Sequence, residues 1–219
     1  MTDSSDTYEA LNTQRKLRVV SILTAAGKAG LEPLGLKRMH TIAYMADALA
    51  PVWDMQILDA QLLKQAGGPM SPTLQRDIDR LVGMGVVIAT NVHHTLETSG
   101  WRLSAEYCLN QGLAIPILNA ALGFDEHAAM YQFVEEVVFA VSAMSLEAIE
   151  RATESDAAYA DPLVDVGGLL DLVAKDETNK TARIARHFGD LVTPGIRITD
   201  AEMTHLYVRH LFRRLQNVA

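Results

Sequence analysis

The residues of this chain best suited to metal or nucleophilic chemistry are seven histidines and a single cysteine. His93 and His94 are adjacent in a predicted hairpin, where successive side chains point to opposite faces. His205 and His210 lie five positions apart on a predicted helix, which is poor spacing for binding one ion. Cys108 has no base near it in the sequence and is expected to be a buried, inert thiol. These residues predict no metal site and no catalytic centre.

Motifs that bind phosphate or activate a nucleophile are missing from the sequence. It contains no GxxxxGKS/T or GxGxxG phosphate loop, no GxSxG nucleophile elbow and no HExxH metal motif. Gly83-Met84-Gly85 is interpreted as the end of a helix. The sequence therefore predicts a protein that is not an enzyme and holds no cofactor.

Basic residues on one predicted helix are candidates for contacts with DNA or with a partner. Arg76 and Arg80 lie one turn apart, with Thr73 on the same helix, and could contact phosphates or a guanine edge. Asp77 and Asp79 lie between the two arginines, so the helix is expected to be nearly neutral on its outer side. DNA contact is then expected to be weak and salt-sensitive, and a solvated network of side chains is the alternative.

The other candidate contacts are also basic. They are Arg102 on a predicted hairpin, Lys180, Arg183 and Arg186 on one C-terminal helix, and Arg209, Arg213 and Arg214 on the last. Two interpretations stay open for the C-terminal residues. They could pair with the acidic residues of the chain itself, or contact DNA phosphates or an acidic partner.

The net charge of −8 is distributed unevenly along the chain. Residues 1–119 carry 11 acidic and 10 basic side chains, and residues 125–177 carry 13 acidic and 2 basic. Residues 178–219 carry 3 acidic and 7 basic side chains. This distribution argues against a uniformly basic nucleic-acid binder and favours a subunit held by other chains.

The composition predicts a helical globular protein. Of the 219 residues, 49% are hydrophobic, 21% charged and only 6% aromatic, which suits packed helices better than a β-sandwich. The single cysteine excludes an internal disulfide. The longest apolar stretch, residues 112–124, is too short to span a bilayer, and the start has no apolar leader. We expect a soluble, cytoplasmic protein.

The N-terminal half has the element order of a winged helix-turn-helix. Residues 1–10 are expected to be disordered, and residues 11–110 to form an N-terminal helix plus the winged helix. Ser71 and Pro72 are a strong helix start. The expected elements are helices over 11–29, 36–49, 58–65 and 71–83, and hairpin strands over 86–92 and 101–107.

The C-terminal half, residues 111–219, is expected to be a helical interaction region, which makes the fold mostly α. A long helix is expected from Asp125 to about Ala152, with an apolar seam from Met130 to Ala148. Residues 199–202 form a capping box before the last helix. Shorter helices are expected over residues 169–174 and 179–188.

Residues 36–87 resemble a known family. The relevant runs are LKRMHTIAYMADALAPVW (36–53), LDAQLLK (58–64), GGP (67–69) and LQRDIDRLVGMGVV (74–87). They are similar to the middle component of ABC-three-component systems, the small winged-helix subunit of Lamassu-type anti-phage operons. The resemblance covers about a quarter of the chain. It implies a non-catalytic adaptor in antiviral defence that joins an SMC-like ATPase and an effector, often a nuclease, on foreign DNA.

Two functions follow as hypotheses. The first is an adaptor subunit of an SMC-like ATPase complex that bridges the ATPase, an effector nuclease and, weakly and through the complex, double-stranded DNA. The second is a winged-helix transcriptional regulator that dimerises through its C-terminal helices and binds DNA tightly by itself. The apolar seam of the long helix is compatible with either. Neither hypothesis involves a membrane.

Overall fold

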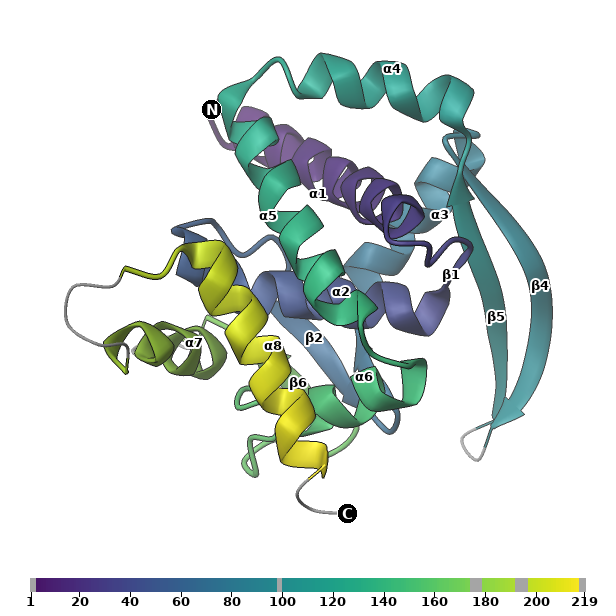
Figure 1. Cartoon of the computed structure of the whole chain (residues 1–219). Helices are drawn as coiled ribbons and strands as arrows, with labels where there is room; N and C mark the ends of the chain where they lie inside the picture. The colour runs from purple at the N-terminus through teal and green to yellow at the C-terminus, as the bar shows by residue number, and fades with distance from the viewer. Residues whose placement is uncertain (1–2, 98–99, 174–178, 192–196, 217–219) are drawn as a thin grey trace.

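The computed structural model describes residues 3–97, 100–173, 179–191 and 197–216 (Figure 1). The helices are α1 (Asp3–Lys28), α2 (Leu36–Leu49), the 3₁₀ helix η1 (Ala50–Trp53), α3 (Pro72–Gly83), α4 (Gln111–Ala121), α5 (Asp125–Ser142), α6 (Leu146–Glu154), α7 (Lys180–Asp190) and α8 (Asp200–Gln216). The strands are β1 (Leu34–Gly35), β2 (Gln61–Gln65), β3 (Gly68–Met70), β4 (Val87–Glu97), β5 (Gly100–Leu109) and β6 (Leu169–Asp171). The prediction of a mostly helical fold is confirmed.

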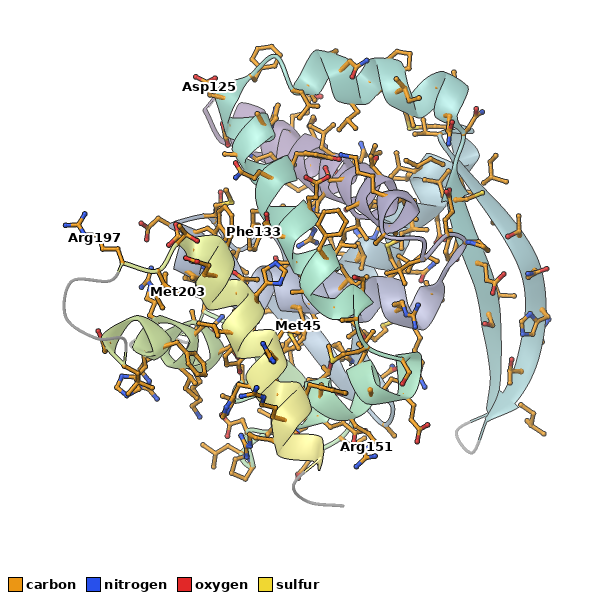
Figure 2. The ribbon with its side chains drawn as sticks, in the orientation of Figure 1. Met45, Asp125, Phe133, Arg151, Arg197 and Met203 are labelled. Carbon is orange, nitrogen blue, oxygen red and sulfur yellow. The ribbon has the colours of Figure 1, made fainter. Side chains whose placement is uncertain are left out.

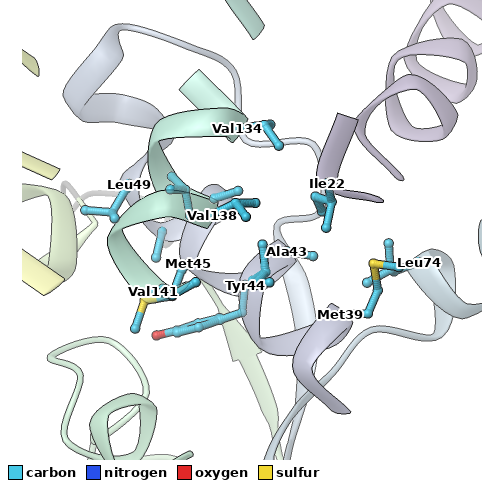
Figure 3. Close-up of a cluster of buried hydrophobic side chains, with 14 of the residues drawn as sticks. Ile22, Met39, Ala43, Tyr44, Met45, Leu49, Leu74, Val134, Val138 and Val141 are labelled. Carbon is cyan, nitrogen blue, oxygen red and sulfur yellow. The ribbon is translucent and has the colours of Figure 1, made fainter. Parts of the chain in front are cut away.

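Helix α2 forms the centre of the molecule. Every residue from Met39 to Leu49 is buried, because α1, α5, α6, α7 and strand β3 all pack against this helix. A helix that is apolar on most sides is stable only when it is enclosed in this way. Figure 3 shows α2 side chains such as Ala43 and Met45 in one cluster with Ile22 of α1 and Val138 of α5.

One apolar core serves both halves of the chain. The buried cluster runs from Val19 on α1 to Leu211 on α8, and α1 lies directly against α5. The expected regions 11–110 and 111–219 therefore share their core instead of folding around separate ones. The apolar seam on α5 is also inside this core, since Val134, Val137 and Val141 are at most 1% exposed.

The six strands form two small antiparallel sheets, with strand orders β1-β5-β4 and β3-β2-β6. Strands β4 and β5 form a long hairpin that extends away from the helices (Figure 1). The short strand β1 lies along β5, with Leu34 opposite Tyr107. The β4–β5 register shifts between Thr90 and His93, where Asn91 has a positive φ of 49°.

Two helices expected from the sequence are strands, so those predictions are wrong. Residues 58–65 contain β2, and residues 169–174 contain β6. Leu62 of β2 lies opposite Leu170 of β6, and both side chains are buried. This pairing joins segments far apart in the chain, and therefore no local pattern of residues could have indicated it.

Two other expectations about helices also need correction. The helix expected from Asp125 to Ala152 is divided into α5 and α6, because the Ser145 hydroxyl accepts a hydrogen bond from Ala148 N (3.2 Å) and starts a new helix. Helix α1 begins at Asp3, although residues 1–10 were expected to be disordered. The sequence contains no proline or glycine before Gly27 to interrupt this helix.

Helix ends with strong local signals lie where the sequence predicts them. Helix α2 spans Leu36–Leu49 as expected. At the start of α8, Thr199 N donates to Glu202 Oε2 (2.8 Å) and Glu202 N donates to Thr199 Oγ1 (3.2 Å), which is the expected capping box. In the described part of the chain, no helix combines the length and apolarity needed to cross a membrane.

Candidate functional site

Helix α3 carries the first set of candidate contacts and is anchored at its N-terminus. The Ser71 hydroxyl accepts from Leu74 N (2.9 Å) and donates to Asp59. Ser71 N donates to Nδ1 of buried His40 (3.2 Å). Because Nδ1 accepts this bond, the ring proton is on Nε2, which donates it to Gln75 Oε1 (3.3 Å). These contacts fix the first turn of α3 against α2.

The expectation that Asp77 faces solvent on α3 is wrong. Its side chain is 2% exposed and pairs with Nε of Arg15 on α1 at 3.1 Å. The expected charge balance of the helix therefore changes, because Asp77 is buried and neutralised by its partner. The exposed side of α3 carries Arg76, Arg80 and Asp79, two cations and one anion.

The remaining candidates of the N-terminal half occupy different surroundings. Thr73 is half-buried in the first turn of α3. Arg80 Nη1 pairs with the second oxygen of Asp77, Oδ1, at 3.8 Å and also reaches Asn12 Oδ1 on α1 (3.5 Å). Arg76 forms none of the ion pairs found among the described residues. Arg102 lies on β5 opposite Thr95, and its side chain is outside the described part of the structure.

The basic residues of α7 are mostly engaged within the chain. Lys180 Nζ pairs with Asp161 Oδ2 at 2.7 Å, which is the expected pairing with the acidic segment 125–177. Arg186 pairs with Asp54 Oδ1 at 2.9 Å, after η1. Arg183 is exposed and is the α7 arginine left for a partner.

Helix α8 exposes three arginines beside α7. Arg209, Arg213 and Arg214 are exposed and form none of the ion pairs between described residues. The helices are adjacent, since the rings of Phe188 and His210 lie 5.5 Å apart. Burial, and then the charge of Arg214, lowers the pKa of His210, so the imidazole stays neutral close to these arginines.

The candidate contacts therefore form two separate groups. Helix α3 lies beside the β4–β5 hairpin, whereas α7 and α8 lie on the opposite side of the molecule (Figure 1). The sequence reasoning also missed that basic residues of the N-terminal half pair with the acidic segment. Lys28 reaches Glu135 (2.6 Å) and Lys37 reaches Glu150 (3.2 Å), so that the two halves are joined by charge as well as by the core.

Helix α4 has an unusual surface for a protein helix. Its sequence, QGLAIPILNAA, has no charged residue, yet Ala114 is its only buried residue. Leu113, Ile115 and Ile117 are 46%, 50% and 39% exposed. A helix that is apolar on all sides is normally enclosed, and exposed apolar surface of this kind is typical of a binding site.

The β4–β5 hairpin next to α4 is exposed too. Ile88, Val92, Leu96 and Leu103 are between 44% and 66% exposed, and the Cδ1 atom of Leu113 lies near Gly85, at the foot of β4. Together, the four hairpin residues and the three exposed α4 residues are called the apolar surface below. The alternation of β5 predicts a half-buried strand, and Ala105 and Tyr107 are buried as expected, whereas Leu103 lies where the hairpin extends past the helices and is exposed.

A buried carboxylate, Asp156, ties the C-terminal helices to α2. It is 0% exposed and accepts hydrogen bonds from three hydroxyls and two backbone N–H groups. These donors form the Asp156 cluster: Tyr44, Tyr207 (2.6 Å), Thr181 (2.8 Å), Ala158 N (3.0 Å) and Tyr159 N (3.2 Å). Burial, and then the nearby Asp156, raises the pKa of Tyr44 and Tyr207 well above the usual range. The cluster is closed to solvent and has a structural role.

No group of three or more metal-binding side chains is found among the described residues. Comparison with family models, with curated proteins and with solved structures finds no match to this chain.

Sequence reasoning also missed the buried ion pair between Arg18 and Asp47, whose atoms are 2.6 Å apart. A signal was present, because each of the two charges interrupts an apolar run of its helix. Isolated charges in such runs are rarely buried without a partner. Burial raises the pKa of Asp47, and the Arg18 guanidinium opposes that rise.

Proposed function

We propose that this chain is a non-catalytic adaptor subunit that docks on a larger partner through the apolar surface. The observation that carries the proposal is α4, an uncharged apolar helix of which only Ala114 is buried. Exposing such a helix in water is unfavourable, and an apolar partner surface would remove it from solvent. The exposed apolar residues of the hairpin lie on both of its faces, and therefore α4 carries the proposal.

We further propose that residues 11–110 adopt a winged-helix arrangement. The order α1, β1, α2, α3, β4 and β5 supports this, with the short strand β1 beside the second strand of the hairpin. The chain departs from the usual motif between α2 and α3. Residues 50–71, with η1 and the β2–β3 hairpin, stand in place of the turn of three or four residues that is typical of a helix-turn-helix.

The proposed partner is an SMC-like ATPase, with an effector nuclease as a further subunit, in defence against foreign DNA. This part of the proposal rests on the resemblance of residues 36–87 to the middle component of ABC-three-component systems. Two features of the chain are compatible with it. The apolar surface could hold the ATPase, and the exposed arginines of α8 could contact an acidic partner or DNA phosphates in the assembled complex.

Co-purification tests the adaptor proposal. The chain is co-expressed with a candidate SMC-like ATPase from its own genome, as wild type and as the double variant Leu113→Glu/Ile117→Glu. The wild type is expected to co-purify, and the double variant to lose the ATPase, because two buried charges at an interface cannot be paired. Leu163→Glu is the matched control, since Leu163 is 88% exposed on a loop outside the apolar surface.

The result that contradicts the proposal is retention of the ATPase by a folded Leu113→Glu/Ile117→Glu protein. Circular dichroism of each variant shows whether the fold is kept. Loss of the ATPase from the Leu163→Glu control would show that any added charge disrupts the complex. In that case the apolar surface would no longer be assigned as the docking site.

A second candidate function is a winged-helix transcriptional regulator. The observation that favours it is Arg76, which is exposed on α3 and forms none of the ion pairs between described residues, with Arg80 one turn away. The α5 seam is enclosed within the chain, so a dimer would have to use another surface.

Titration of double-stranded DNA at several salt concentrations distinguishes the two functions. A regulator binds specifically in the nanomolar range and loses affinity in Arg76→Glu, whereas an adaptor binds weakly by itself. Arg151→Glu is the matched control for Arg76→Glu, because Arg151 is exposed on α6, which packs beside α8 and lies apart from α3 (Figure 2). Tight, specific binding by the isolated chain would overturn the adaptor proposal.

A further inference from the structure

A cavity of about 340 Å³ lies between α1, α2, η1 and the first half of α5. This volume is within the range of pockets that hold small molecules. Its walls are largely apolar and include Trp53, Met130 and Phe133, the last of which is labelled on α5 in Figure 2. The rings of Trp53 and Phe133 lie 5.5 Å apart, and Trp53 Nε1 donates to Thr204 Oγ1 (3.0 Å), which fixes the indole. The cavity therefore has a rigid aromatic wall.

Arg18 places an incompletely bonded guanidinium at this cavity. Its side chain is 2% exposed, and Nη1 donates to Asp47 Oδ2 at 2.6 Å. The other two nitrogens, Nε and Nη2, are buried and have no hydrogen-bond acceptor among the described residues. They form one edge of the planar group, with two N–H bonds that point in the same direction. Arginine keeps its proton in proteins, and this edge can therefore be satisfied only by an acceptor.

The protein around Arg18 offers no such acceptor. Asp47 is held in place, because its Oδ1 already accepts from Leu58 N (2.9 Å) and Asp59 N (3.2 Å). A second polar atom of the cavity lining, His127 Nδ1, is also buried without a partner. The Arg18 edge can only donate, and His127 Nδ1 donates or accepts according to its tautomer. The Arg18 edge therefore indicates a ligand with oxygen acceptors on an apolar body.

The charges around the cavity narrow the class of ligand. Glu126 and Asp54 also line it, and Asp47 balances the charge of Arg18. These carboxylates oppose a doubly charged phosphate group. A single carboxylate places less negative charge near them, and its two oxygens match the paired N–H bonds of the free arginine edge.

We propose that this cavity binds a small aromatic or aliphatic monocarboxylate. The carboxylate pairs with Nε and Nη2 of Arg18, and the apolar body lies against Trp53 and Phe133. Because Nε and Nη2 are shielded in the unliganded protein, binding requires a lining side chain to move, and the unbranched Met130 is the lining residue best suited to this. The site is independent of the apolar surface, so its failure would leave the adaptor proposal intact.

Benzoate, benzamide and inorganic phosphate are the probes that test this proposal on the full chain. Binding is followed by the ¹⁵N–¹H signal of Arg18 Nε and by the change in Tm. Benzoate is expected to shift that signal with a Kd below about 1 mM. Benzamide, of similar shape but uncharged, is expected to bind at least about tenfold more weakly, and phosphate to leave the signal unchanged. Absence of a benzoate shift, or equal binding of benzamide, overturns the proposal.

Two variants test the position of the site. Arg18→Lys keeps the charge near Asp47 but removes the paired N–H edge, and it is expected to weaken benzoate binding at least about tenfold. Met130→Trp fills the cavity without altering the ion pair and is expected to abolish binding. Met84→Trp is its matched control, because Met84 is 60% exposed at the end of α3, outside the cavity. If Arg18→Lys does not fold, Met130→Trp and Met84→Trp still test the position of the site. Equal benzoate affinity of these two variants overturns the proposal.

Discussion

Tyr207→Phe is expected to destabilise the protein more than Tyr44→Phe, although each removes one hydroxyl from the same buried carboxylate. The reason is the distribution of donors over the two oxygens of Asp156. Oδ1 accepts only from Tyr207 among the described residues (2.6 Å). Oδ2 accepts from Tyr44, from Thr181 (2.8 Å) and from two backbone N–H groups. Losing Tyr207 therefore leaves one oxygen of a buried carboxylate without a donor.

The magnitudes follow from the cost of hydrogen bonds to charged groups. Tyr207→Phe leaves Oδ1 unsatisfied and is expected to lower the free energy of unfolding by about 3 kcal/mol, at the upper end of the range for such bonds. Tyr44→Phe leaves three donors on Oδ2 and should cost about 1 kcal/mol. Both rings are 1% exposed, and phenylalanine preserves their apolar packing. For a chain of 219 residues, the larger loss corresponds to a fall in Tm of roughly 6 to 12 °C.

Urea denaturation followed by far-ultraviolet circular dichroism measures both losses, provided that the m-value is unchanged. Tyr131→Phe serves as the control, because its hydroxyl donates to the partly exposed Glu135 (3.1 Å) and should contribute about 0.5 kcal/mol or less. Equal losses for Tyr207→Phe and Tyr44→Phe, or a larger loss for Tyr44→Phe, would refute the reasoning from the separate oxygens.

Three further predictions concern the cap of α3, alkaline stability and the cysteine. Ser71→Ala removes the acceptor of Leu74 N and a donor to Asp59 and should cost about 2 kcal/mol, seen as a lower Tm; an unchanged Tm would exclude the Ser71 hydroxyl as a source of stability. Burial raises the pKa of Tyr159 in the folded protein to about 12. The same hydroxyl has a pKa of about 10 in the unfolded chain. Stability should therefore fall as the pH rises through this window, because the unfolded tyrosine loses its proton first. In Tyr159→Phe the urea midpoint should depend less steeply on pH. An unaltered dependence would contradict the contribution of Tyr159 to the loss of stability. Burial, and then Glu32, raises the pKa of Cys108, so a thiol reagent should modify it more slowly in the folded than in the urea-unfolded chain. Glu32→Gln should speed the reaction in the folded chain, and an equal or lower rate would exclude the charge effect.

Elements with local signals could be predicted from the sequence alone. Helix α2 has a continuous apolar pattern that ends before Pro51, and its bounds match the prediction. Ser71 caps α3 as expected, and Thr199 and Glu202 form their capping box. Each of these features depends on residues within one turn of each other, and such contacts form in the same way in many folds.

Features that depend on distant residues could not be predicted. Strand β2 pairs with its neighbour β3 and also with β6, where Leu62 lies opposite Leu170, more than a hundred positions away. Asp77 is buried because Arg15 of α1 meets it, and the spacing of charges within α3 alone suggested an exposed carboxylate. The candidate site was therefore predicted only in part. The exposure of Arg76, Arg80 and the α8 arginines agrees with the sequence, but their separation into two groups does not follow from it.

The central position of α2 has a consequence for synthesis of the chain on the ribosome. Residues 36–49 emerge long before α5, α6 and α7, which cover them in the finished protein. At translation rates of about 5 to 20 residues per second, the first half waits several seconds or more with apolar side chains uncovered. During that interval the nascent chain is a substrate for chaperones and proteases. A premature stop after β5 would release a fragment that remains in this vulnerable state.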